Sequence, residues 1–327
     1  MRPLAALPKA HLHLHLEGGM RPSTLAELAD REGMTVPPIR GYGDFGAFAG
    51  MYDAACEVLR TPDDLARVVR EAAVDAAAAG AVWLEPALYA PLHRARLGPP
   101  REVLGIVLEA GRAATAETGV GIGWMLAADR TEDPADAVEQ ARLAAEYAGA
   151  GVVSFGLAND EGRFGPEPFA PAFALAKAAG LLSTPHAGEL AGPDSVRGAL
   201  DTLRPDRLGH GVRAIEDPAL VARLADEQVC LDVCPTSNAL LSVVGDLAEH
   251  PLPRLLDAGV PCSVNGDDPL LFGSGLLEEY TVCRDRMGLS DAALAAVATA
   301  SLVHSGAPED VRRAGVAAVD AWLATPT

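Results

Sequence analysis

Short runs of apolar or β-branched residues alternate along the chain with longer segments in which apolar residues recur at helical spacing. A short apolar run bounded by turn residues is typical of a buried strand, and a period of about 3.6 residues is typical of a helix on a core. The pattern predicts strands over Ala10–Leu16, Ala81–Leu88, Gly121–Ala127, Val152–Leu157, Leu181–His186, Arg207–His210, Val229–Cys234 and Val260–Asn265. It predicts intervening helices over Pro62–Ala79, Arg101–Thr118, Pro134–Ala148, Pro168–Ala179, Asp194–Leu203, Asp217–Glu227 and Leu247–Ala258.

Eight strands with helices between them favour a parallel sheet closed into a barrel over an open sheet. The 327 residues contain no low-complexity linker, repeat or break in composition, and their number suits one barrel domain. A further helical stretch, Tyr42–Leu59, follows the first strand. Its aromatic and methionine side chains could line a substrate pocket or simply pack at the barrel mouth: Tyr42, Phe45, Phe48, Met51 and Tyr52. The sequence thus predicts a single (β/α)8 TIM barrel over residues 1–327, with a helical insertion after strand one.

Composition narrows the class of protein. The chain is 49 % hydrophobic but only 5 % aromatic, so we expect a large core packed by alanine-rich helices. No apolar stretch approaches the length of a membrane span, and the segment before the first histidines is too short and weakly apolar for a signal peptide. A net charge of −19 disfavours nucleic acid and anionic lipid as partners. We therefore expect a soluble cytoplasmic protein that acts on a small molecule, with its oligomeric state left open.

The five cysteines include no Cys-x-x-Cys pair. An odd number of cysteines in a chain that is expected to be cytoplasmic suits buried free thiols better than a disulfide framework. We therefore expect all of them to pack as small apolar side chains.

Polar residues gather where four of the predicted strands end, on the face of a barrel that carries catalytic groups. Alternation along strand one puts His13 and His15 on the same face, so that both could bind one metal ion. A lone histidine in a buried strand is more often a core residue, so this pair is weak evidence by itself. Strands five, six and eight end with further polar groups: His186 and Glu189, His210, and the adjacent Asp267 and Asp268. Their convergence on one end of the barrel predicts a single site, since adjacent buried carboxylates need a compensating positive charge.

Three histidines and one aspartate form an open set of nitrogen and oxygen ligands, which suits a catalytic Zn²⁺ with a water molecule in the remaining position. A binuclear hydrolase would usually carry a bridging group, often a modified lysine, at the end of strand four. Strand four, Val152–Leu157, contains no lysine. The sequence therefore predicts one zinc ion per chain, although iron or cobalt could occupy the same ligands.

In this order the motifs resemble the adenosine deaminase family over essentially the whole chain. The motifs are PKAHLHLHLEG (8–18), HAGE (186–189), LGHG (208–211), CPTSN (234–238) and SVNGDDP (263–269). The family pattern begins with Pro-Lys and places its two metal histidines on either side of one apolar residue, just before an acidic residue and a glycine. That register selects His13 and His15, and it leaves His11 one layer deeper in the barrel.

The resemblance implies a hydrolytic deaminase that removes the 6-amino group of an adenosine-type purine and releases ammonia. It implies that His210 and Asp267 orient and deprotonate the attacking water. It also implies that Glu189, kept protonated in a dry pocket, donates a proton to ring N1, and that Asp268 hydrogen-bonds ring N7. The zinc ligands that it implies are His13, His15, His186 and Asp267.

The half of the site that would determine substrate specificity departs from the family pattern. Adenosine deaminases typically end strand four with Asp-Leu-Ala-Gly-Asp-Glu and hold the glycine amide near purine N3, whereas this chain has GLANDE (156–161). Asn159 thus replaces the glycine, and Glu17 stands where the nucleoside enzymes usually carry an aspartate on the ribose 5′ side. The residues expected to contact substrate are Glu17, Asn159, Gly188 and Asp268.

These departures leave several 6-aminopurines open as substrate. Adenosine or deoxyadenosine is the first expectation. Aminodeoxyfutalosine, whose ribose 5′ side carries a benzoate, is a further nucleoside, and its carboxylate would pair with Arg94, Arg96 or Arg163. Free adenine is the alternative, because three features are similar to the branch of the family that includes adenine deaminases and related enzymes. They are Glu17, Glu85-Pro86 after strand two, and Glu161-Gly162 followed by Pro168-Phe169. AMP is less favoured, since a phosphate would need several basic groups.

Two functions of other classes are disfavoured by named residues. A non-catalytic metal-binding relative should have lost Glu189, His210 or Asp268, and all three are present. Another amidohydrolase reaction, such as the opening of a cyclic amide, should lack the glutamate of HAGE and carry the strand-four lysine.

Overall fold

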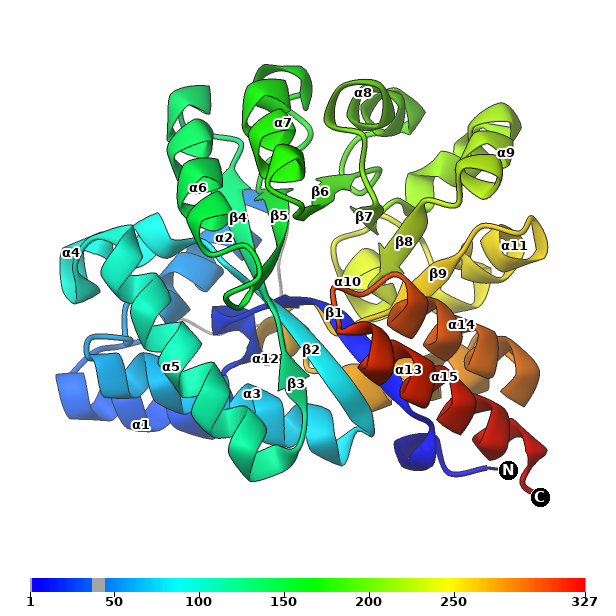
Figure 1. The fold of residues 1–327 in the computed structure, drawn as a ribbon, viewed down its shortest axis with the longest axis horizontal. Helices are drawn as coiled ribbons and strands as arrows, with labels where there is room; N and C mark the ends of the chain where they lie inside the picture. Colours follow the sequence, from blue (N-terminus) through cyan, green and yellow to red (C-terminus); the bar gives the residue numbers. More distant parts are fainter. Residues whose placement is uncertain (1, 37–44, 327) are drawn as a thin grey trace.

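The computed structural model describes residues 2–36 and 45–326. Its strands run parallel and follow one another around a barrel, with helices outside them (Figure 1). β3 pairs only with β2, so the strand segments of the described residues occupy eight positions around the barrel. The predicted (β/α)8 barrel is confirmed. The strands are β1 (Lys9–His15), β2 (Ala81–Leu88), β3 (Gly121–Ile122), β4 (Trp124–Asp129), β5 (Val152–Ala158), β6 (Leu182–Ala187), β7 (Arg207–His210), β8 (Cys230–Val233) and β9 (Cys262–Val264).

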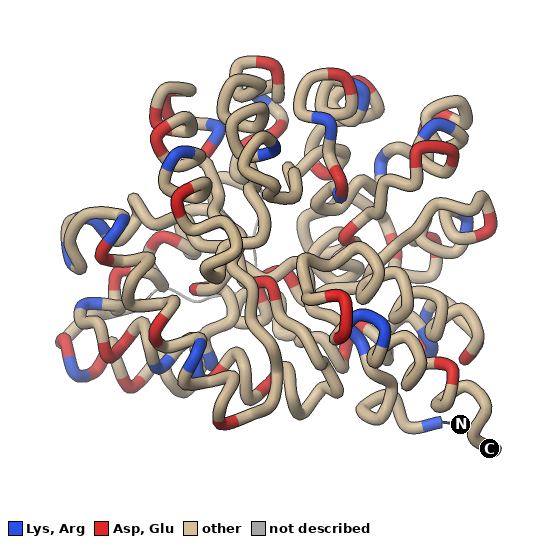
Figure 2. The backbone as a smooth tube through the Cα atoms, viewed as in Figure 1, with Lys and Arg blue, Asp and Glu red and all other residues tan. Residues whose placement is uncertain are grey.

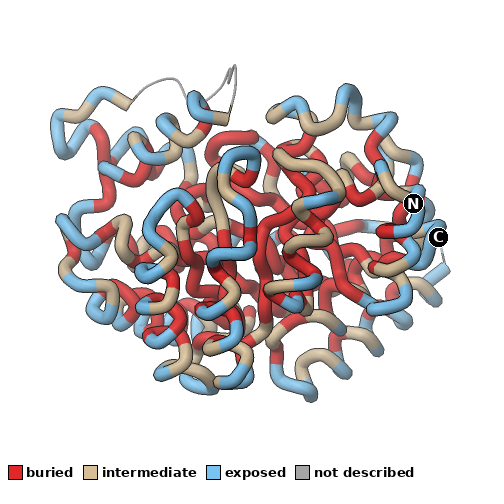
Figure 3. The backbone as a smooth tube through the Cα atoms, turned by 90° about the horizontal axis from the view of Figure 1, so that it is seen from above, coloured by how far each residue is buried: buried red, intermediate tan, exposed pale blue. Residues whose placement is uncertain are grey.

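Helices form the outer layer, and Figure 3 shows them surrounding the buried central strands. Many begin with proline at the first turn, where its missing N–H costs nothing. The helices are α1 (Pro22–Glu32), α2 (Phe45–Cys56), α3 (Pro62–Ala78), α4 (Arg94–Leu97), α5 (Pro100–Thr118), α6 (Pro134–Glu146), α7 (Ala170–Ala178), α8 (Pro193–Leu203), α9 (Pro218–Glu227), α10 (Pro235–Leu240), α11 (Leu252–Asp257), α12 (Pro269–Phe272), α13 (Leu276–Asp285), α14 (Asp291–Val303) and α15 (Glu309–Ala324).

The third predicted strand is divided into β3 and β4 at Gly123. The indole of Trp83 packs against this point, and a Cβ on Gly123 would lie 2.6 Å from its Cζ2 atom. The close approach requires glycine, and the strand pairing shifts there from β3 to β4. The sequence pattern alone could not show which side chain would pack against this glycine.

The insertion after β1 contains α1, which the sequence reading missed, and α2, which covers most of the predicted stretch Tyr42–Leu59. Tyr42 itself lies outside the described residues. A helical period was present in α1, because Leu25 and Leu28 share its buried face and Gly33 ends it in the left-handed conformation. Within the insertion, α1 packs against α3 through Thr24 and Arg31, and α2 lies at the mouth of the barrel.

Burial follows the alternation expected for β1. Leu12, Leu14 and Leu16 are almost fully buried within the apolar core, while the intervening histidines belong to the opposite face of the strand. Charged residues lie mainly on the outer helices (Figure 2). All five cysteines are buried and unpaired, as predicted. Among the described residues, no helix is both long and apolar enough to cross a membrane.

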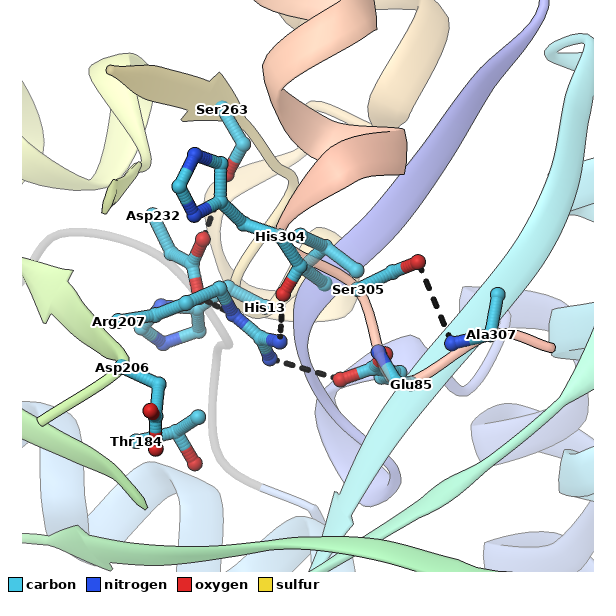
Figure 4. A network of polar contacts seen from close by, with 12 residues as sticks. His13, Glu85, Thr184, Asp206, Arg207, Asp232, Ser263, His304, Ser305 and Ala307 are labelled. Atoms are coloured by element: carbon cyan, nitrogen blue, oxygen red, sulfur yellow. Dashed lines mark hydrogen bonds and ion pairs between the residues drawn. The ribbon is translucent and has the colours of Figure 1, made fainter. Parts of the chain in front are cut away.

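A buried ion network crosses the barrel interior (Figure 4). Arg207 of β7 has no exposed side-chain surface, and its Nη2 and Nε atoms lie 2.7 and 2.8 Å from the carboxylates of Glu85 on β2 and Asp232 on β8. Its Nη1 donates a third hydrogen bond to the main-chain oxygen of His304, at 2.8 Å. An unpaired buried guanidinium would cost several kcal/mol, so the two carboxylates are needed for Arg207 to tie these strands together.

Lys9 makes the stability of this fold depend on pH. Its buried Nζ donates to the main-chain oxygens of Leu4 and Ala79, and burial lowers its pKa to about 7. The unfolded chain, with an ordinary lysine pKa of 10.5, therefore holds a proton above pH 7 that the folded chain lacks, so the folded state gains stability as pH rises.

In urea unfolding, we expect the stability of wild type relative to Lys9→Met to increase by about 4 kcal/mol between pH 7 and pH 10. A constant difference between the two proteins across that range would contradict the depressed pKa of Lys9.

Candidate active site

The polar residues predicted at the strand ends come together at the carboxyl end of the barrel. Nε2 of His13 and Nε2 of His15 lie 3.2 and 3.4 Å from Oδ1 of Asp267. The ring of His186 lies 4.6 Å from that of His13 and 5.3 Å from that of His15, measured between ring centres. All four predicted metal ligands therefore face one small space.

The chemistry of this space fits a metal ion. Among the described residues, Nδ1 of His186 is buried without a hydrogen-bond partner, and Nε2 of His13 makes no well-aligned hydrogen bond despite its 3.2 Å approach to Asp267. Unpartnered buried imidazole nitrogens are costly unless something compensates them, and neutral imidazole is a good ligand for Zn²⁺. Two overlapping groups of possible ligand atoms each lie within 4.8 Å of one another: His13, His186, His210 and Asp267, and then His15, Asp267 and Asp268.

Hydrogen bonds across the junction of β9 and β1 hold these ligands in register. The main-chain N–H of Asp267 donates to the oxygen of His13, and the N–H of His15 donates to the oxygen of Asp267, both at 3.1 Å. The side-chain oxygen of Asn265 accepts from the N–H groups of Leu12 and His13, at 2.7 and 3.1 Å. The metal candidates on the first and last strands are therefore positioned by the closure of the barrel.

His11 occupies a different position from the other histidines of β1. Its Nε2 atom accepts a hydrogen bond from the main-chain N–H of Gly266, at 3.1 Å. Burial lowers the pKa of His11 to about 3, which keeps the ring neutral and able to accept. The side chain thus supports the β9–β1 junction, and it does not belong to either group of possible metal ligands.

Glu189 follows β6 in a turn that a second glutamate organises. Glu161 accepts hydrogen bonds from the main-chain N–H groups of Gly188, Glu189, Leu190 and Ala191, at 2.5 to 3.1 Å. Burial, together with the charges of Asp267 and Glu161, raises the pKa of Glu189 well above its usual range. The sequence reading assigned no role to Glu161, although its place in the GLANDE segment was a usable signal. The main-chain N–H of Gly188 already donates to Glu161, so Gly188 helps to hold this turn in place.

His210 at the end of β7 lies beside Glu189, with Nε2 of the imidazole 3.4 Å from Oε1 of the carboxyl. Its Nδ1 atom is 3.1 Å from Nδ2 of Asn238. Oδ1 of Asn238 is in turn 3.2 Å from Nε2 of His250, whose Nδ1 accepts from the main-chain N–H of Leu252. Sequence reasoning gave Asn238 and His250 no role, although Asn238 closes the CPTSN motif.

Asp268 offers a free acceptor or donor to a ligand. Its Oδ1 atom is buried and has no hydrogen-bond partner among the described residues. Burial and the neighbouring charges of Asp267 and Glu17 raise its pKa well above the usual range. A Cβ on Gly18 would overlap this carboxyl group, so Gly18 is required for Asp268 to take its position.

A cavity of about 570 Å³ opens above these groups. Phe45, Phe48 and Tyr52 of α2 line it, so this part of the insertion does contribute to the pocket; Met51 is not among the lining residues. Asn159 also lines it, with Nδ2 donating to Asp129 at 2.8 Å. The polar groups on its wall that the sequence singled out are His15, His186, Glu189, His210, Asp267 and Asp268.

Glu17 is buried behind this cavity and does not line it. Its carboxylate accepts a hydrogen bond from the hydroxyl of Tyr52, at 2.6 Å, and lies 2.6 Å from Nε2 of His93. These partners hold the pKa of Glu17 below its usual value despite the burial. Glu17 is therefore connected to the cavity by its hydrogen bond to Tyr52, which lines the wall.

The outer wall of the cavity is strongly acidic. Its only lysine or arginine among the described residues is Arg94. Of the other arginines considered for a substrate carboxylate, Arg96 is paired with Glu57, and Arg163 is 77 % exposed and does not line the cavity. The acidic residues on the outer wall are Asp53, Asp129, Glu132, Asp136 and Glu139.

Three cavity residues other than glycine adopt the left-handed backbone conformation. The φ angles are 80° at Asn159, 61° at His210 and 58° at Asp267. Asparagine, aspartate and histidine are enriched among the few residues other than glycine that adopt this conformation. The backbone at these strand ends is turned sharply so that the side chains face the cavity.

Comparison with known proteins agrees with this geometry. The sequence matches the adenosine deaminase family over residues 8–322. A putative adenosine/adenine deaminase from Streptomyces coelicolor is 47 % identical, covering 99 % of this chain and 98 % of its own. The structure of adenine deaminase from Arthrobacter aurescens is similar with a TM-score of 0.89 at 29 % identity, over 99 % of this chain and 100 % of that one. A zinc-bound amidohydrolase from Burkholderia ambifaria gives a TM-score of 0.89 at 27 % identity, over 98 % and 92 %.

The family match and the similarity to the Streptomyces protein both span nearly the whole barrel. They include every strand end that carries a predicted site residue. The chain belongs to the adenosine deaminase family and is a hydrolytic deaminase of the amidohydrolase superfamily.

Proposed function

We propose that this enzyme uses one zinc ion to remove the 6-amino group of an adenosine-type purine nucleoside by hydrolysis, releasing ammonia. The observation that carries the proposal is the cavity of about 570 Å³ above the histidine and carboxylate cluster. Small-molecule sites typically have volumes of about 300 to 1,000 Å³, so this cavity has room for a whole nucleoside. The space therefore suits a base at the cluster and a sugar toward the outer wall.

The zinc ligands in this proposal are four residues whose side chains face one small space: His13, His15, His186 and Asp267. The similarity to a zinc-bound amidohydrolase supports this choice of metal. When bound, zinc would lower the pKa of a water molecule toward neutrality, which is the chemistry that the side chains do not supply themselves.

The remaining polar groups would handle the purine and the water. Glu189, buried and favoured in its protonated form, would donate a proton to ring N1 and so reduce the resistance of the aromatic ring to attack at C6. The unpartnered Oδ1 of Asp268 would meet ring N7. His210 and Asp267 face the same space and would orient and deprotonate the water.

Free adenine is the second candidate substrate. It is favoured by the position of Glu17, which stands on the expected ribose 5′ side but is already engaged by Tyr52 and His93. The named activity of the similar Arthrobacter enzyme, an adenine deaminase, points the same way. The acidic outer wall makes anionic substrates, AMP and aminodeoxyfutalosine, less favourable than either candidate, because like charges repel.

Ammonia release from a substrate panel tests the proposed function. We expect adenosine and deoxyadenosine to be turned over, with kcat/KM at least about tenfold above AMP and aminodeoxyfutalosine because the single Arg94 cannot offset five carboxylates. A chelator should abolish turnover, and zinc should restore it. Turnover of adenine alone would establish the second candidate, and rapid turnover of AMP would contradict the role given to the outer wall.

Replacing Glu189 with Gln removes the proton donor while keeping the shape of the side chain. We expect kcat to fall by about 10²-fold or more, with zinc content unchanged, because Glu189 is not one of the proposed ligands. Ammonia assays together with metal analysis would measure both quantities. Near-full activity in Glu189→Gln would show that the proton reaches N1 from elsewhere.

Replacing Asp267 with Ala removes a proposed zinc ligand and the carboxylate that lies between His13 and His15. We expect zinc and activity to be lost together. Metal analysis after dialysis checks this, with Asp268→Ala as the neighbouring control that should keep its zinc. Stoichiometric zinc in the Asp267→Ala variant would refute the ligand role.

A further inference from the structure

We propose that Asn238 and His250 are positioning residues that hold the imidazole of His210 with its proton on Nε2. In that form His210 enters the reaction as a hydrogen-bond donor and is neither a metal ligand nor the base. This role rests on the proposed function only in placing His210 beside the reacting atoms.

The direction of the hydrogen bonds is set at Leu252, in the first turn of α11. Its main-chain N–H can only donate, and it donates to Nδ1 of His250 at 3.1 Å. A neutral imidazole whose Nδ1 accepts carries its proton on Nε2. His250 is 3 % exposed, and burial lowers its pKa to about 4, which is consistent with a neutral ring. Its Nε2 must therefore donate.

The next partner along the chain of bonds is the amide of Asn238. Because Nε2 of His250 donates, the atom 3.2 Å away must be the amide oxygen, and the amide nitrogen then points at His210. The opposite amide orientation would bring two donors together at His250. The segment is also held in place, since the main-chain oxygen of Asn238 accepts from the N–H groups of Val243 and Val244.

The last member is His210. Nδ2 of Asn238 donates to its Nδ1 at 3.1 Å, so Nδ1 carries no proton and Nε2 does. The Nε2–H group is directed toward the cavity, 3.4 Å from Oε1 of Glu189 and 3.9 Å from Oδ2 of Asp267. A protonated nitrogen has no lone pair to offer a metal ion.

This tautomer decides between the two groups of possible ligands. His210 lies as close to Asp267 and His13 as a ligand would, but its Nε2 is occupied by a proton. The zinc set is then completed by His15, as the spacing on β1 suggested. The tautomer also gives the two residues different roles toward the water. His210 donates a hydrogen bond to the water oxygen, and Asp267 accepts the proton when the O–H bond breaks.

The direct test is ¹⁵N NMR of the zinc-loaded enzyme labelled at histidine, with the His210 resonances identified by their loss in His210→Asn. The nitrogen chemical shifts distinguish a protonated from an unprotonated ring nitrogen. We expect an unprotonated Nδ1 and a protonated Nε2 at His210. A protonated Nδ1 with a free or metal-bound Nε2 would overturn the proposal.

Variants of His250 separate positioning from simple packing. His250→Leu fills the space but loses the donor, whereas His250→Gln keeps an amide N–H that can reach Asn238. We expect His250→Leu to lower kcat/KM by about 10- to 100-fold and to disturb the His210 tautomer, with zinc content and Tm close to those of His250→Gln. His250→Gln should retain the tautomer and much of the activity. Equal losses in both variants with an unchanged tautomer would mean that His250 only packs.

Asn238→Asp reverses the direction of the hydrogen bond to His210 with almost no change in the shape of the side chain. A carboxylate can only accept from both imidazoles, so it demands a proton on Nδ1 of His210. We expect the NMR pattern of His210 to gain that proton and kcat to fall about tenfold or more while zinc stays bound. An Asn238→Asp enzyme with the wild-type tautomer of His210 would refute the positioning role of Asn238, even if the substrate panel gives the expected result. If the substrate panel fails instead, the tautomer measurement still tests the positioning role.

Discussion

The closure between the last strand and the first is the constraint on which the active site depends. In the described residues, β1 is bridged to the segment that follows β9 by one isolated pair, Leu14 and Asp267, so side chains supplement the main-chain bonds at this junction. The side-chain oxygen of Asn265 accepts hydrogen bonds from two main-chain N–H groups of β1. The main chain of Asp267 donates a hydrogen bond to His13 and accepts one from His15. Three of the four proposed zinc ligands therefore sit on the junction itself, and a shift there would separate them.

The orientation of Asn265 is in turn fixed from deeper in the barrel. Arg207 holds Asp232, whose other oxygen accepts the hydroxyl proton of Ser263 at 2.7 Å. The Ser263 oxygen is then the acceptor for the amide nitrogen of Asn265, at 2.8 Å, which leaves the amide oxygen facing β1. A buried charge thus determines the direction of every hydrogen bond up to the junction, as buried polar networks do when each member is satisfied.

Much of this could be read from the sequence because it depends on local periodicity and on strand-end chemistry. The alternation around His13 and the position of His186, His210 and Asp267 at strand ends predicted that these side chains converge at the carboxyl end of the barrel, and the structure brings them together there. The break at Gly123 was missed because the packing of Trp83 decides it, whereas α1 carries a helical period that the prediction overlooked. Asn238, His250 and Glu161 act through hydrogen bonds to groups distant in sequence, and no spacing rule predicts such partners.

The left-handed backbone at Asn159, His210 and Asp267 also limits how this site can vary. In the described residues only six positions other than glycine have positive φ, and three of them line the cavity. A β-branched residue placed at any of the three would meet steric strain of order 1 to 3 kcal/mol before its chemistry mattered. Mutational libraries aimed at new substrates will therefore meet a stability cost at these positions beyond glycine, asparagine, aspartate and histidine, and more freedom on α2 and the outer wall.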